Sequence, residues 1–110
     1  MEEKIRYGNL FDFYGDLLNE HQRRICEASF MEDLSLAEIA EEMDMTRQGV
    51  HNHLVRAQKA LDEYENKLGL YRKFVSIRAD VGQIMELVEK KDDECSKNIA
   101  QLAGNILDII

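Results

Sequence analysis

The sequence contains no proline, no tryptophan and only two cysteines among its 110 residues. Because proline interrupts helix interiors, its absence allows long unbroken helices. Cys26 and Cys95 belong to no paired-cysteine motif, so we expect free thiols in a reducing compartment. No apolar run approaches the ~20 residues that span a bilayer, and the acidic residues 1–4 do not begin a signal peptide. These absences predict a cytoplasmic protein without membrane insertion.

Helical periodicity dominates the residues that are present. Hydrophobic residues make up 45% of the chain and charged residues 33%, which suits a soluble domain with a core. Apolar positions recur at spacings of three and four, and strand-like alternation is nearly absent. We therefore expect an all-α fold, with one domain or a small domain plus an extension.

Residues 35–56 have the spacing of a helix-turn-helix. Ser35 and Thr46 can cap two successive helices through their hydroxyl groups, with a turn expected at residues 43–45. Glu38, three residues after Ser35, completes a capping box. The side chains expected to hold the two helices together are Ile39, Ala40, Met43, Val50 and Leu54.

Two further helices are expected before this motif. The first covers about residues 4–18, and Asn19, with Gln22 three residues later, caps a second helix that runs to about residue 30 or 31. The inward side chains of the first are predicted to be Leu10, Phe11, Phe13, Tyr14, Leu17 and Leu18. The side chains near the buried side of the second are predicted to be Ile25, Cys26, Ser29 and Phe30.

The helix that follows Thr46 is expected to be long, ending near Leu68 with Gly69 as its stop. Two apolar stripes follow it, and an acidic start at residues 92–94 precedes the second. The stripes are Phe74, Ile77, Val81, Ile84 and Val88, and then Cys95, Ile99, Leu102, Ile106 and Ile109.

These two stripes allow two interpretations. They could fold back to complete one core, or they could bind a second copy or a partner, because a heptad-like seam is best buried against another helix. We divide the chain into a helix-turn-helix domain at residues 1–68 and a C-terminal helical extension at residues 69–110, which we expect to be a dimerisation element.

Charge is distributed unevenly along a chain whose net charge is −8. DNA-binding domains are usually basic, because neutralising phosphates supplies much of the affinity. Residues 45–61 contain three basic side chains and no acidic one, whereas residues 38–44 contain four acidic side chains and no basic one. The second helix of the motif is thus a basic island beside an acidic helix.

The exposed face of that second helix carries the candidate nucleic-acid contacts. Gln48 and Asn52 can each pair with adenine, and Arg47 can pair with guanine or a phosphate. Backbone amides behind Thr46 could also hold a phosphate, and Arg23 and Arg24 could flank the site. The same residue types also occur on any solvated helix. The candidate residues are Thr46, Arg47, Gln48, His51, Asn52, Arg56 and Lys59.

No pattern in the sequence indicates an enzyme, a cofactor or a metal site. His51 and His53 lie two residues apart and therefore on different helix faces, and His21 has no neighbouring ligand in the sequence. Phosphate-binding glycine loops and nucleophile motifs are also lacking. We therefore expect a non-enzymatic protein with no cofactor and no metal.

Residues 34–54 resemble region 4 of bacterial sigma factors. A more specific resemblance, to the YlxM family of small bacterial proteins, extends over more than half of the chain. Its motifs are Leu10–Leu18, Asp33–Glu42, Arg47–Gln48 and Tyr64–Phe74. The resemblance implies a sigma-region-4-like all-α domain with a helical tail, a dimer, and a regulatory role in the signal recognition particle (SRP) pathway. It assigns no catalytic residues.

Two hypotheses of function follow. The first is a regulator that binds DNA through the helix after Thr46. The second is a protein-interaction module that contacts an SRP GTPase, its receptor or the SRP RNA and modulates the GTPases without binding DNA. In the second, the acidic side chains of Glu38, Glu41 and Glu42 would form the interaction face.

Overall fold

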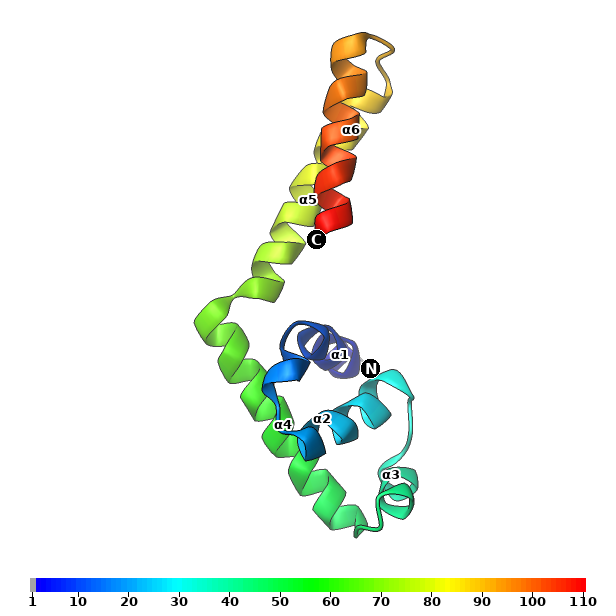
Figure 1. Cartoon of the computed structure of the whole chain (residues 1–110), viewed down its shortest axis with the longest axis vertical. Helices are drawn as coiled ribbons and strands as arrows, with labels where there is room; N and C mark the ends of the chain where they lie inside the picture. Colours follow the sequence, from blue (N-terminus) through cyan, green and yellow to red (C-terminus); the bar gives the residue numbers. More distant parts are fainter. Residues whose placement is uncertain (1) are drawn as a thin grey trace. The chain divides into compact units, whose positions relative to one another are not determined.

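The computed structural model describes residues 2–110, and it confirms the all-α prediction for this range (Figure 1). Contacts divide the chain into two compact units, of which the first ends at Tyr71 and the second begins at Arg72. None of the helices within residues 2–110 is long and apolar enough to cross a membrane. The helices are α1 Glu2–Tyr14, α2 Glu20–Cys26, α3 Leu36–Glu42, α4 Arg47–Leu68, α5 Leu70–Glu89 and α6 Glu94–Ile109.

The first helix is shorter than predicted. It ends at Tyr14, and a 3₁₀ turn at Gly15–Leu17 follows, closed by a hydrogen bond from the Leu18 amide to the Gly15 carbonyl (3.1 Å). This tighter turn changes the direction of the chain, so Leu17 is exposed while Leu18 is buried. The prediction that Leu17 and Phe13 pack inward is therefore wrong, although Leu10 and Tyr14 are fully buried as expected.

The second helix begins as predicted, because the Asn19 Oδ1 atom accepts a hydrogen bond from the Gln22 amide at 2.7 Å. Regular α-helical geometry ends at Cys26, and the chain continues as a π-helical segment over Glu27–Met31. The helical path thus reaches the predicted end with a wider final turn. Its most buried side chains are Ile25, Cys26 and Ala28.

Helix α4 joins the two clusters of buried side chains that form the core of the first unit. Ala57 and Leu61 belong to one cluster and Val50 to the other, while Leu54 packs against both. Their partners in the first cluster are Leu10, Tyr14, Leu18 and Cys26, and in the second Ile25, Ala28, Ile39 and Ala40. The residues that orient α4 are therefore supplied by α1, α2 and α3.

The end of α4 is anchored to α1 by the buried Tyr14. Its hydroxyl donates a hydrogen bond to Glu65 Oε1 (2.6 Å) and accepts one from the Leu70 amide (3.0 Å). Burial raises the pKa of the Tyr14 phenol, and the hydrogen bond to Glu65 raises it further. The helix ends at Leu68, as predicted, and Gly69 adopts the left-handed conformation (φ 64°) that glycine accepts most readily.

Replacing Tyr14 with phenylalanine is expected to lower the free energy of unfolding by about 1–3 kcal/mol, because the Leu70 amide loses its buried partner. Tyr64→Phe is the matched control, since its hydroxyl makes one exposed hydrogen bond to the Leu17 carbonyl at 3.3 Å. We expect a smaller loss there. Urea denaturation of both variants measures the difference, and equal losses would refute the anchoring role.

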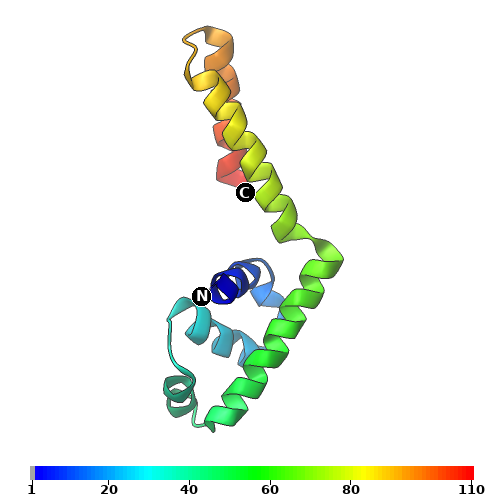
Figure 2. The same ribbon diagram turned by 180° about the vertical axis from the view of Figure 1, so that it is seen from behind.

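The second unit is a helical hairpin in which α6 runs back along α5 (Figures 1 and 2). Asp93 caps α6 by accepting a hydrogen bond from the Ser96 amide at 2.7 Å, within the acidic start that the sequence predicts. The buried positions are Val81 on α5 and Ser96 and Ala103 on α6. These C-terminal residues thus pack with one another as a compact unit.

Candidate nucleic-acid interface

Helix α3 begins with the predicted capping box. Ser35 Oγ accepts a hydrogen bond from the Glu38 amide (3.1 Å), and Glu38 Oε1 accepts one from the Ser35 amide (3.0 Å). These hydrogen bonds lower the pKa of the Glu38 carboxyl. The carboxylate of Glu38 therefore has a structural role at the start of the first helix of the motif.

The turn between α3 and α4 lies where the sequence predicts it. The Met43 amide donates to the Ile39 carbonyl and the Met45 amide donates to the Ala40 carbonyl, both at 2.9 Å. Asp44 between them has a φ of 54°, a left-handed conformation that aspartate tolerates better than most residues. The left-handed conformation of this residue could not be predicted from the spacing that placed the turn at residues 43–45.

Thr46 caps α4 as predicted, with its Oγ1 atom accepting a hydrogen bond from the Gly49 amide at 2.9 Å. A Cβ atom at position 49 would lie 3.0 Å from that oxygen, so glycine leaves room for the cap. The first turn of α4 contains no acidic side chain. The positive end of the helix dipole therefore faces solvent without a neutralising carboxylate from this turn.

All seven predicted contact residues, which lie between residues 46 and 59, are exposed. The buried side chains of the same helix, Val50 and Ala57, face the core. Arg47 and His51, with two neighbouring side chains, line an open hollow of about 520 Å³. The exposed residues, called the α4 face below, are Thr46, Arg47, Gln48, His51, Asn52, Arg56 and Lys59.

Two amides of the α4 face are already paired with each other. Gln48 Nε2 donates a hydrogen bond to Asn52 Oδ1 at 3.0 Å, one helical turn along. The remaining groups of this pair are the Gln48 carbonyl oxygen and the Asn52 NH₂ group. An acceptor and a donor of this kind are what the major-groove edge of adenine requires. The pair is thus ordered before any ligand binds.

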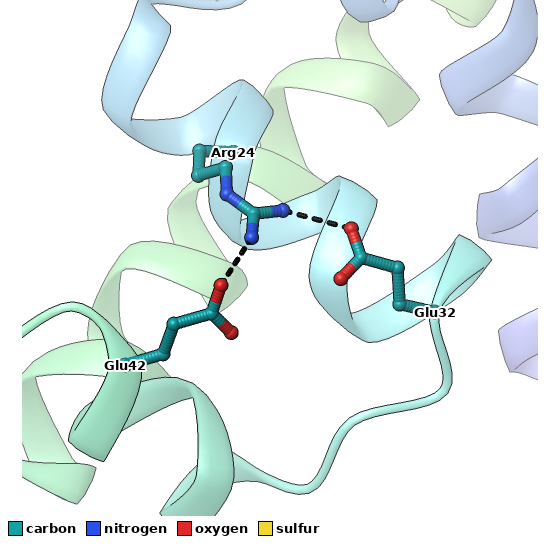
Figure 3. Close-up of polar contacts among 3 residues, drawn as sticks. All are labelled: Arg24, Glu32 and Glu42. Carbon is teal, nitrogen blue, oxygen red and sulfur yellow. Dashed lines mark hydrogen bonds and ion pairs between the residues drawn. The ribbon is translucent and has the colours of Figure 1, made fainter.

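Arg24 has a structural role that the sequence did not predict. Its guanidinium group donates to Glu32 Oε2 (2.8 Å) and to Glu42 Oε1 (2.5 Å), joining α2 to α3 (Figure 3). Both carboxylates raise the pKa of Arg24, and the contribution of Glu32 is the larger. Arg24 is thus engaged by two carboxylates, and its role as a flanking phosphate contact stays a prediction. Arg23 lies 3.5 Å from Asp16 in a weaker, exposed ion pair.

The acidic residues of α3 line a second hollow of about 380 Å³, together with Leu34. Glu38 accepts the capping hydrogen bond and Glu42 accepts the one from Arg24. Two of the three predicted interaction residues, Glu38 and Glu42, are thus engaged within the protein, and Glu41 is exposed beside them. The charge of Glu42 is offset by Arg24, whereas the capping hydrogen bond leaves the negative charge of Glu38 in place.

The sequence indicates no neighbour for His21, but in the structure its side chain contacts two other residues. Its ring stacks on the His53 ring at a centroid distance of 4.8 Å, and its Nε2 atom lies 3.1 Å from Met45 Sδ. This contact joins α2 to α4 and cannot be read from local spacing. His51 lies on the exposed α4 face instead. Over residues 2–110, no three His, Cys, Asp or Glu side chains gather in a way that could hold a metal ion.

Comparison with known proteins gives consistent matches over most of the chain. The family model described as "Putative helix-turn-helix protein, YlxM / p13 like" matches residues 1–102. A UPF0122 protein of Halalkalibacterium halodurans is 41% identical over 91 residues, which cover 83% of this chain and 84% of that protein. A UPF0122 protein of Bacillus thuringiensis is 39% identical over 92 residues, 84% of each chain.

Proposed function

The chain belongs to the YlxM/p13-like UPF0122 family of helix-turn-helix proteins, and from this premise we propose that it is a non-enzymatic regulator that binds DNA through the α4 face. The observation that carries the proposal is the exposure, on residues 47–59 of one helix, of Arg47, Gln48, Asn52, Arg56 and Lys59. A helix of this kind can enter the major groove, which is about 12 Å wide, and read base edges.

The charge along α4 supports this orientation. Its acidic residues, Asp62, Glu63 and Glu65, all follow the basic half of the helix. Asp62 accepts a hydrogen bond from Tyr7 (2.7 Å) and pairs with Arg6 (2.8 Å). Asp62 and Glu65 thus lie toward α1, where Glu65 accepts a hydrogen bond from Tyr14. Phosphates approaching the N-terminal half of α4 would meet basic groups and the positive end of the helix dipole.

Arg24 reduces the obstacle that the acidic α3 presents to DNA. By pairing with Glu42 it offsets one negative charge on the helix that precedes the turn. The capping hydrogen bond holds the carboxylate of Glu38 against its own helix. A chain with a net charge of −8 can therefore still present a basic surface to phosphates at the start of α4.

The test is binding to DNA selected from a random pool by the full chain. Arg47→Ala/Gln48→Ala should weaken binding by about fivefold or more, because the lost base contact of Gln48 costs about 1–3 kcal/mol and the phosphate contact of Arg47 is lost as well. Asn66→Ala/Lys67→Ala also removes one basic and one amide side chain, from the far end of α4, and should leave binding unchanged. Equal affinity of the first variant and the wild type would overturn the proposal.

A second candidate function is favoured by the acidic hollow on α3. Its carboxylates and the apolar Leu34 could receive a basic segment of a protein partner, and the YlxM resemblance implies an SRP GTPase or its receptor. Glu38→Gln/Glu41→Gln/Glu42→Gln retains the capping box, since glutamine also serves at that position. Loss of partner binding with unchanged DNA binding would favour this candidate. Unchanged partner binding would reject it.

A further inference from the structure

The α5–α6 hairpin buries its small side chains and exposes its large ones. Ser96 and Ala103 are the buried residues of α6, and Val81 is that of α5. Seven large aliphatic side chains remain between 38% and 84% exposed, and we call them the hairpin face. They are Ile77, Ile84 and Leu87 on α5, and Ile99, Leu102, Ile106 and Ile109 on α6.

These side chains lie on one side of the hairpin. At about 100° per residue, Ile77 and Ile84 are rotated by about 40° and 60° from the buried Val81 in the same sense. Ile99 and Ile106 have the same spacing from Ala103, four residues before it and three after it. Two antiparallel helices are related by a two-fold axis perpendicular to the plane that contains them. This axis keeps each side of the plane on the same side. Because the isoleucine pairs on α5 and α6 are rotated equally from the buried residues, both pairs lie on the same side of the hairpin.

We propose that the hairpin face binds the hairpin face of a second copy of this chain, giving a four-helix bundle. Charge favours this occupant. The segment from residue 72 to 110 contains six Lys and Arg against seven Asp and Glu, so two copies repel little, and no charged partner of either sign is selected. On α5, Lys73 and Asp80 lie between Ile84 and Leu87 around the helix, within the hairpin face. They carry opposite charges and can pair across a two-fold axis.

The apolar area of the hairpin face approaches that of a dimer interface. A homodimer interface of about 800 Å² per subunit that is about 65% apolar needs roughly 520 Å² of apolar surface. At about 25 cal/mol per Å², the burial energy of a Leu or Ile side chain corresponds to roughly 60–120 Å² when the side chain is fully exposed. With the exposed fractions of its seven side chains, the hairpin face supplies about 230–460 Å² per copy.

The thiol of Cys95 can be used to detect whether this interface forms. Cys95 is exposed and lies eight residues before Ala103, a rotation that places it beside Leu102 at the α6 border of the hairpin face. Cys26 is fully buried, and burial raises its pKa to about 12, so it stays unreactive in the folded protein. The rate of thiol labelling therefore reports the accessibility of Cys95.

The test is the mass of the full chain by sedimentation equilibrium, combined with Cys95 labelling. We expect a dimer at about 100 μM, with labelling that slows as protein concentration rises. Leu102→Ser/Ile106→Ser should give a monomer that labels about tenfold faster or more than the dimer. Gln101→Ser/Asp108→Ser, on the side of α6 away from the hairpin face, should remain dimeric.

Circular dichroism checks that each variant keeps its helices. A wild-type monomer at 100 μM, or a Leu102→Ser/Ile106→Ser variant that dimerises as the wild type does, would overturn the proposal. If the variant loses its helices, the wild-type mass and the concentration dependence of its Cys95 labelling still decide. Neither readout depends on DNA, so the outcome is separate from that of the proposed function.

Discussion

Replacing Leu61 with alanine is expected to lower the free energy of unfolding of the first unit by about 2–5 kcal/mol. Leu61 is fully buried and packs in the cluster that holds Leu10, Tyr14 and Leu18 against α4. Truncation removes these contacts and leaves a cavity that the surrounding helices fill only in part. Because small domains are stable by about 5–15 kcal/mol, this one change would remove a large fraction of the total.

Leu68→Ala is the matched control for Leu61→Ala. Both leucines lie on α4, but Leu68 is 46% exposed, so we expect a loss of about 1 kcal/mol or less. Urea denaturation of each variant, followed by circular dichroism, measures the two losses. If both were equally small, the buried cluster around Leu61 would not be what holds α1 to α4.

The affinity of one wild-type α4 face for DNA should fall about 40-fold when the salt concentration rises from about 50 to about 200 mM. This figure follows from three phosphate contacts and a slope of about −0.9 for each in a plot of log affinity against log salt concentration. Arg47, Arg56 and Lys59 are the exposed bases that would make them. Arg47→Gln/Arg56→Gln/Lys59→Gln should flatten the slope toward zero and abolish most of the affinity at low salt.

A second triple variant separates local contacts from net charge. Lys67→Gln/Lys90→Gln/Lys91→Gln removes three exposed bases outside the α4 face and changes the net charge by the same amount. Its salt slope should equal that of the wild type. Fluorescence anisotropy over a salt series measures both variants, and equal flattening of the two slopes would assign the affinity to overall charge.

Local features of the fold could be predicted from the sequence. The caps at Asn19, Ser35 and Thr46 form as expected, because each depends on residues within three positions along the chain. The end of α4 at Gly69 and the exposure of the α4 face follow from helical periodicity in the same way. The function of that face stays a prediction, because exposure alone does not identify a ligand.

Contacts between distant segments could not be predicted. The pairing of Arg24 with Glu42 and the stacking of His21 on His53 depend on how α2 packs against its neighbours. The 3₁₀ turn after Tyr14 shortened the first helix for a similar reason, since the chain turns there to cover the core. Each of these outcomes is decided by tertiary packing, which overrides local preference.

The packing of the two C-terminal apolar stripes could also be predicted only in part. Periodicity correctly places Ile99, Leu102 and Ile106 on one side of α6, but it does not say which side packs on α5. The hairpin instead buries Ser96 and Ala103, since small side chains allow two helices to approach closely. The expected interface with a second copy thus stays a prediction, now with a defined face.

The central claim, that the α4 face binds DNA, is tested most directly by mapping amide chemical shifts of the isotope-labelled chain during titration with a selected duplex. We predict that the largest changes fall on residues 46–59, with small changes on α3. Changes centred on Glu38, Glu41 and Glu42, or no change at any duplex concentration, would contradict the claim.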